Sequence, residues 1–176
     1  MTSKISLAVL ILFLVTSLSC QDSKTVTTNN EPEISTFFFI RHAEKDRSDK
    51  TNRNPELTEE GLDRAQKWRD IFSEVTFDHV YSTDYNRTKQ TAQPTAAKNN
   101  LEISIYDPSN LDGPLFIESN KGKTVLVVGH SNTTPSFVNA VINEEKYDSI
   151  DDLNNGKLFM VSIIDGTAKT TVLQIN

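Results

Sequence analysis

Two histidines and two arginines lie at or just beyond the ends of three apolar segments of this chain. They are Arg41, His42, Arg87 and His130. A lone Arg-His pair occurs by chance in many proteins. Here only three histidines exist, and His42 and His130 end apolar segments in the same way. The third, His79, precedes its segment and is expected to be structural or solvated. The repeated placement favours a catalytic site.

A sheet is needed to bring these residues together. Apolar runs that alternate with helix-like stretches indicate an α/β three-layer sandwich, with a mainly parallel sheet and helices on both faces. Ligands bind such sheets at the carboxyl ends of the strands, where the four side chains fall. The expected strands are residues 36–40, 80–82, 101–106 and 125–129, with a C-terminal hairpin of residues 157–164 and 169–175. Three helices are expected. The first begins after an N-cap at Thr58, and the other two cover residues 85–98 and 133–142.

The blocks around these residues resemble the histidine phosphatase superfamily, also called the phosphoglycerate mutase-like family. The blocks are Arg41-His42-Ala43-Glu44, residues 54–61 with Ala65-Gln66, Tyr81-Ser82-Thr83 with Arg87-Thr88 and Thr91-Ala92, and Val127-Val128-Gly129-His130-Ser131. They follow the family's order and cover most of the chain from about residue 36 to residue 141. The resemblance implies that His42 is a nucleophile and that Arg41, Arg87 and His130 bind the phosphate.

Phosphoryl transfer asks mainly for positioning and for positive charge around the phosphoryl oxygens. His42 would form a phosphohistidine that water later hydrolyses. Its attacking nitrogen must be unprotonated, so the other ring nitrogen needs an acceptor. The leaving alkoxide needs a proton donor, which in the family is often an acidic residue after the next strand. Asp107 is the expected acid, with Asp112 and Glu44 as rivals.

The predicted activity is therefore metal-independent hydrolysis of a small phosphomonoester. The glutamate motif of the mutases is not found, and no lid-sized insertion is present, which favours a phosphatase over a mutase-like phosphotransferase. A non-catalytic phospholigand-binding lipoprotein is a further alternative, although all four pocket residues are in place. No metal or cofactor is expected, because residues 151–156 match a calcium loop only in part, with Leu153 at a ligand position.

Length and charge narrow the classes of protein further. The 176 residues and the formal charge of −6 suit one domain with a sizeable core. This mild acidity, without a basic patch interleaved with aromatic residues, argues against a nucleic-acid binder.

The amino terminus predicts export. Lys4 precedes the apolar residues 5–18 and then Ser19-Cys20, the layout of a secretory signal that is short for a membrane span. Cys20 resembles the lipobox cysteine of bacterial lipoproteins, although Ser17 stands where an aliphatic residue is usual. An ordinary signal peptide cut nearby and an uncleaved anchor are the alternatives. The expected organisation is a signal peptide (1–19), a flexible tether (20–35) and a domain (36–176), held on a membrane by lipid on Cys20, on its periplasmic or cell-surface side.

Overall fold

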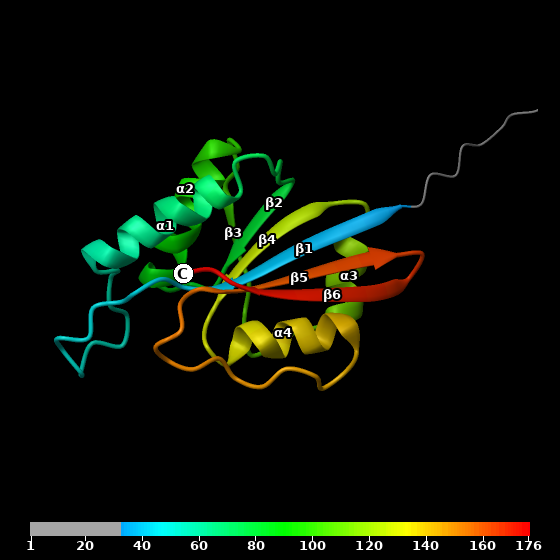
Figure 1. Cartoon of the computed structure of the whole chain (residues 1–176). Coiled ribbons are helices and arrows are strands. Elements are labelled where there is room, and N and C mark those ends of the chain that lie inside the picture. Colours follow the sequence, from blue (N-terminus) through cyan, green and yellow to red (C-terminus); the bar gives the residue numbers. More distant parts are fainter. Residues whose placement is uncertain (1–32) are drawn as a thin grey trace, which may run out of the picture. The chain divides into compact units, whose positions relative to one another are not determined.

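A six-stranded sheet forms the centre of the protein, whose computed structural model describes residues 33–176. The strand order is β3-β2-β4-β1-β5-β6 (Figure 1). The strands are β1 (Ile34–Arg41), β2 (His79–Ser82), β3 (Ile103–Ile105), β4 (Thr124–Gly129), β5 (Lys157–Ile164) and β6 (Thr167–Gln174). The first four are mutually parallel, whereas β5 pairs antiparallel with β1 and β6 antiparallel with β5. The expected mainly parallel sheet with a C-terminal hairpin is confirmed.

Helices cover both faces of this sheet. Figure 1 shows α1 (Glu59–Ile71) and α2 (Asn86–Lys98) on one face, and α3 (Gly113–Ser119) and α4 (Thr133–Ile142) on the other. The alternation of side chains along β1 explains the division, because successive strand residues point to opposite faces. Phe38 and Ile40 pack with α1 and α2, while Phe37 and Phe39 pack with α3 and α4. The four consecutive apolar residues are thus buried on both sides, as expected for a central parallel strand.

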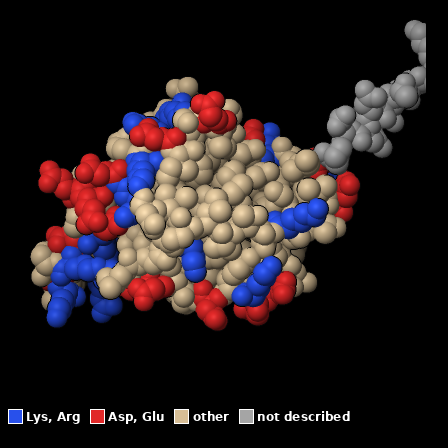
Figure 2. All heavy atoms as spheres, viewed as in Figure 1, with Lys and Arg blue, Asp and Glu red and all other residues tan. Residues whose placement is uncertain are grey.

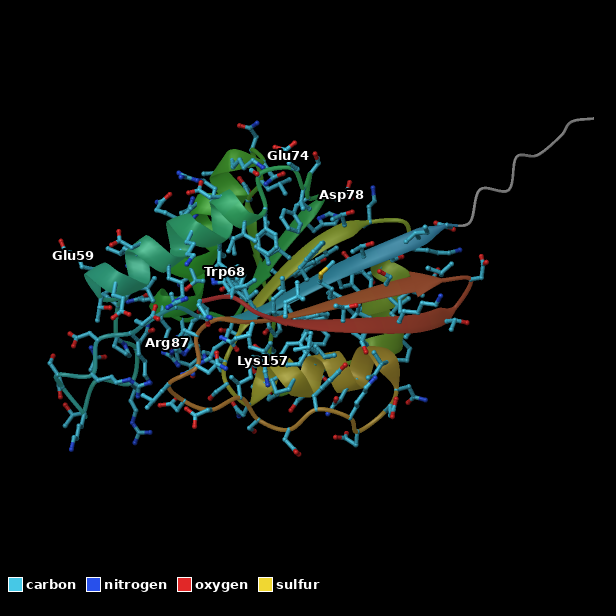
Figure 3. The ribbon with its side chains drawn as sticks, viewed as in Figure 1. Glu59, Trp68, Glu74, Asp78, Arg87 and Lys157 are labelled. Atoms are coloured by element: carbon cyan, nitrogen blue, oxygen red, sulfur yellow. The ribbon has the colours of Figure 1, made fainter. Side chains whose placement is uncertain are left out.

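The start of α1 is fixed against the segment that follows β1. Thr58 caps the helix, since its Oγ1 accepts a hydrogen bond from the backbone N–H of Gly61 at 3.1 Å. A Cβ on Gly61 would lie 2.1 Å from the carbonyl oxygen of Glu44. Only glycine therefore lets α1 approach this closely. Trp68, labelled in Figure 3, is buried on the same helix and stacks on Phe72.

Several elements differ from the sequence prediction. Strand β1 begins at Ile34, two residues inside the expected tether (20–35), and β3 covers only Ile103–Ile105 of the expected residues 101–106. Helix α3 lies inside residues 107–120, where the sequence analysis expected no helix. It has only seven residues, too few for a helical pattern to stand out. Strand β6 begins at Thr167 and not at residue 169, because Asp165 and Gly166 both have positive φ and close a two-residue turn. No helix within residues 33–176 is long and apolar enough to cross a membrane.

Candidate active site

The carboxyl ends of β1, β2 and β4 lie next to one another. Arg41 pairs with Gly129 across β1 and β4, and Ser82 pairs with Val128 across β2 and β4. The residues that follow these strands must therefore meet at one edge of the sheet. They surround a cavity of about 340 Å³. Its walls include His42, Lys45, Tyr85, Arg87, Pro108, His130 and Asp152.

His42 is held on its backbone and on one ring nitrogen. Its N–H donates to the carbonyl of Gly129 at 2.9 Å, and its carbonyl accepts from Nδ2 of Asn155 at 2.7 Å. Nδ1 lies 2.7 Å from the carbonyl oxygen of Ala43. A carbonyl can only accept, so Nδ1 carries the proton and Nε2 keeps its lone pair. The acceptor that the nucleophile was expected to need is therefore its own neighbour in the chain.

The surroundings keep His42 neutral. The side chain is 3% exposed, and burial is the main cause that lowers its pKa to about 3. The positive charges of Arg41 and Arg87 act in the same direction, while the hydrogen bond to Ala43 opposes them. A neutral imidazole with a free Nε2 is the state that a nucleophile requires.

Arg87 brings unpaired donors into the cavity. It is the second residue of α2, and Figure 3 shows it beside the ends of β1 and β4. Its Cζ lies 4.4 Å from the centre of the Tyr85 ring, which positions the guanidinium. Nε and Nη1 are buried and have no hydrogen-bond partner within residues 33–176. Buried donors without partners cost stability, so these two atoms suit an anion that binds in the cavity.

His130 closes the opposite wall, and both of its ring nitrogens are occupied. Its ring centre lies 5.6 Å from that of His42. Nη2 of Arg87 can only donate, and it lies 3.4 Å from Nδ1, which must accept. Nε2 then donates to Oγ1 of Thr83 at 2.9 Å. Burial is the main cause that lowers the pKa of His130 to about 4, with further contributions from Arg87 and Lys45. His130 is therefore neutral here and becomes a phosphate donor at Nδ1 only after gaining a proton.

Most of the Arg41 guanidinium contacts other parts of the protein, and only one nitrogen remains for the phosphate role that the resemblance implied. It is fully buried and does not line the cavity. Nη1 donates to the carbonyls of Asp151 (2.9 Å) and Asn154 (3.3 Å), and Nη2 to Oδ1 of Asp152 (2.6 Å). Only Nε lacks a partner among the described residues. Arg41 thus holds the loop at residues 151–154, and a single nitrogen remains for phosphate.

The same loop matches a calcium loop only in part, and two of its carbonyls contact Arg41. Its carbonyls at Asp151 and Asn154 face the guanidinium of Arg41, so a protein cation already fills that position. Residues 33–176 contain no group of three or more acidic, histidine or cysteine side chains able to hold a metal ion.

Asp107 does not fit the role of the general acid. Its carboxylate is exposed and accepts from the N–H (2.9 Å) and the hydroxyl (2.7 Å) of Ser109. These bonds lower the pKa of Asp107, so the carboxylate is ionised in the ligand-free protein. The adjacent Pro108, and not Asp107, lines the cavity. A carboxylate two residues before a serine is satisfied in a local turn, so the ligand-free structure gives the expected acid role of Asp107 no support.

The other two candidate acids, Glu44 and Asp112, also form contacts away from the cavity. Oε1 of Glu44 lies 2.6 Å from Nε of Arg64 on α1, and Asp112 caps α3 through the N–H of Leu115. Neither lines the cavity. The sequence blocks placed all three acids near the site, but they could not show which way the side chains point.

Four residues of the site were not predicted as such: Lys45, Tyr85, Asp152 and Asn155. Lys45 lines the cavity and forms no ion pair with any residue from 33 to 176. Burial lowers its pKa first, followed by Arg87 and Arg47. Its signal was its position three residues after His42. Figure 2 shows basic side chains gathered where Figure 1 places the loop after β1, so the cavity opens beside positive charge.

Comparisons with known proteins agree with this fold. The model of the histidine phosphatase superfamily (branch 1) matches residues 37–108. No curated protein matches the chain.

Among solved structures, the protein histidine phosphatase SixA complexed with tungstate is similar, with a TM-score of 0.64 and 17% identity over 79% of this chain and 96% of that one. A phosphoserine phosphatase mutant from Entamoeba histolytica, in complex with phosphoserine, gives 0.60 and 15% over 78% and 95%. A mycobacterial glucosyl-3-phosphoglycerate phosphatase gives 0.61 and 13% over 82% and 100%. Likeness at this identity establishes a shared fold.

Proposed function

We propose that the chain is a member of the histidine phosphatase superfamily and that it hydrolyses a small phosphomonoester through a phosphohistidine on His42. The observation that carries the proposal is the hydrogen bond from Nδ1 of His42 to the carbonyl of Ala43, which leaves Nε2 unprotonated on a residue that lines a cationic cavity. The similar solved structures named above are phosphatases, which supports hydrolysis as the reaction class.

In the first step Nε2 of His42 attacks phosphorus, and the bond from phosphorus to the leaving oxygen breaks. Arg87 offers Nε and Nη1 to the phosphoryl oxygens, and Arg41 offers Nε. His130 adds a donor at Nδ1 once the bound dianion raises its pKa. In the second step water attacks the phosphohistidine, and the nitrogen–phosphorus bond breaks to release phosphate and restore His42.

The leaving oxygen requires a proton, and Lys45 is the group best placed to supply it. Among the ionisable groups on the cavity wall, Asp152 is held by Arg41 and Arg47 and has a lowered pKa, so it is ionised. Lys45 carries protons on a flexible chain and has no acidic partner within the described residues. After donation its neutral amine can take the proton back from the attacking water.

Two alternatives have less support. A phospholigand-binding protein without activity has no need of a neutral, lone-pair-bearing His42 at the centre of its pocket. A mutase-like phosphotransferase is disfavoured because the glutamate motif of the mutases is not found and no lid-sized insertion is present.

The proposal is tested with the full chain in mild detergent, by phosphate release from an aryl phosphate with and without a chelator. We expect activity that His42→Ala abolishes and that the chelator leaves unchanged, since the proposed mechanism uses no metal. Activity lost on chelation and restored by a divalent ion would disprove metal independence. No release under any condition would favour the binding protein.

Cys20 lies outside the described residues, and we propose that it carries the lipid of an exported bacterial lipoprotein. The support is the sequence around it: one lysine, an apolar stretch and small residues before the cysteine. The full chain should partition with membranes, and Cys20→Ser should release it or block its processing. A mature terminus without lipid, read by mass spectrometry, would contradict this.

A further inference from the structure

A second hollow adjoins the phosphate cavity. It has a volume of about 660 Å³, and its walls include Tyr85, Ile105, Tyr106 and Pro108. Tyr85 and Pro108 also line the phosphate cavity. The two spaces therefore share two lining residues.

The walls of this hollow are apolar and exposed. Ile105 is 52% exposed and Tyr85 36% exposed, although both are large apolar side chains. Ile105 ends β3, an edge strand, on the same face as the core residue Ile103. Single exposed apolar residues are common, but several around one hollow next to a reactive site indicate a ligand.

The rim of the hollow carries negative charge. Asp84 and Asp107 line it, and no lysine or arginine does. Ser109 holds the Asp107 carboxylate in its ionised form. A leaving group with its own carboxylate or second phosphate would meet repulsion here.

The space on the other side of the phosphate cavity has the opposite character. Lys45 lines this space as well as the phosphate cavity, and Arg47 and Lys50 line this space too. It is smaller, at about 200 Å³, and Arg47 is already paired with Asp152 at 2.7 Å. It also contains the carboxylates of Asp46 and Asp49. The larger volume and the apolar surface therefore both favour the hollow at Tyr85 and Ile105 as the place for the leaving group.

We infer that this hollow binds the leaving group of the substrate and selects neutral aromatic phosphomonoesters. The inference rests on the proposed function, because it places the ester oxygen between the phosphate cavity and the hollow. The aromatic ring would lie against Tyr85 and Pro108 and reach Ile105. Ile105 is then a specificity residue with no contact to the phosphoryl group.

The test compares two esters whose leaving phenols have similar acidity but different size, phenyl phosphate and 2-naphthyl phosphate. The full chain should favour the naphthyl ester in kcat/KM by about tenfold, because the second ring buries more apolar surface. Ile105→Ala should reduce this preference to about threefold or less, and Ile105→Glu should abolish it. A carboxylated phenyl phosphate should be a poorer substrate than phenyl phosphate. The control is Ile34→Ala, which changes an equally exposed isoleucine at the far end of β1 (47%).

A ratio near one between the kcat/KM values of the naphthyl and phenyl esters would overturn the inference. A naphthyl preference that Ile105→Ala leaves unchanged would also overturn it. Preference for the carboxylated ester would instead assign the leaving group to the Lys45 side. If neither ester is turned over, the proposed hydrolysis fails, and this outcome by itself says nothing about the hollow. In that case the dissociation constants of the two esters with the His42→Ala chain decide, and equal constants would overturn the hollow as a binding site.

Discussion

The Nδ1 atom of His42 donates its proton to the carbonyl oxygen of Ala43, the next residue in the chain, over 2.7 Å. Donor and acceptor are thus fixed by local backbone geometry. Ala43 is itself held, because its N–H donates to Oγ1 of Thr91 on α2 at 2.9 Å. The tautomer of the nucleophile therefore depends on the docking of α2 against the end of β1.

The buried histidines should make the protein sensitive to acid. In the unfolded chain a histidine has a pKa of about 6.5, whereas burial lowers the pKa of His42 to about 3 and that of His130 to about 4. Below pH 6.5 only the unfolded state gains these protons. Stability is therefore complete above pH 6.5 and falls as the pH approaches the folded values, by up to about 1.4 kcal/mol per pH unit for each histidine.

Urea unfolding at pH 7.5 and pH 5 measures this loss. His42→Gln should lose at least about 1 kcal/mol less than the unchanged chain between the two values. His79→Gln, at the start of β2, is the control and should behave like the unchanged chain. An identical loss in His42→Gln would show that His42 is not held neutral by the fold.

Binding of a phosphate-like anion should be accompanied by proton uptake at His130. Its Nδ1 accepts from Arg87 in the ligand-free protein, so it can donate to an anion only after protonation. Calorimetry of tungstate binding at pH 7, in buffers with different heats of ionisation, should show uptake of about one proton. His130→Asn should remove this uptake. Heats that do not depend on the buffer would mean that His130 stays neutral in the complex.

The Arg87 guanidinium should be needed for activity but should lower the stability of the folded protein. Its buried Nε and Nη1 have no partner within residues 33–176, so removing the charge relieves a desolvation cost. Arg87→Met should slow kcat by about 10²-fold, the scale of losing one preorganised donor, and should raise stability by about 1 kcal/mol. Arg69→Met, on the exposed face of α1, should change neither. A destabilised Arg87→Met would indicate a structural role for the guanidinium.

The dependence on the leaving group should identify the proton donor. Lys45→Met should slow an alkyl phosphate by about 10²-fold or more and an activated aryl phosphate by much less, because only the alkoxide needs a proton. Asp107→Asn should slow both by less than about twofold, since its carboxylate is exposed and ionised. Arg47→Met controls for a general loss of positive charge. A strong alkyl-specific loss in Asp107→Asn would restore Asp107 as the acid.

Much of the fold could be predicted because single segments determine it. The run at residues 37–40 is apolar on both faces, which only a central strand satisfies, and Thr58 caps its helix through a local hydrogen bond. The register of β1 with β4 then brings His42 and His130 to one edge. Helix α3 escaped prediction because seven residues carry too little pattern.

The site was only partly predictable because side-chain directions depend on partners far along the chain. The guanidinium of Arg41 is oriented by carbonyls 110 and 113 residues away. The backbone of His42 is held by Asn155, again 113 residues distant. Asp107 is the opposite case, because the hydroxyl of the nearby Ser109 donates to its carboxylate and orients it locally.

The central claim is that His42 forms a covalent bond to phosphorus, and rapid-quench trapping of the full chain with a ³²P-labelled aryl phosphate tests it most directly. We expect an acid-labile, base-stable label that maps to the peptide containing His42 and is absent from His42→Ala. Turnover without any label on that peptide, or a label retained in His42→Ala, would contradict the account.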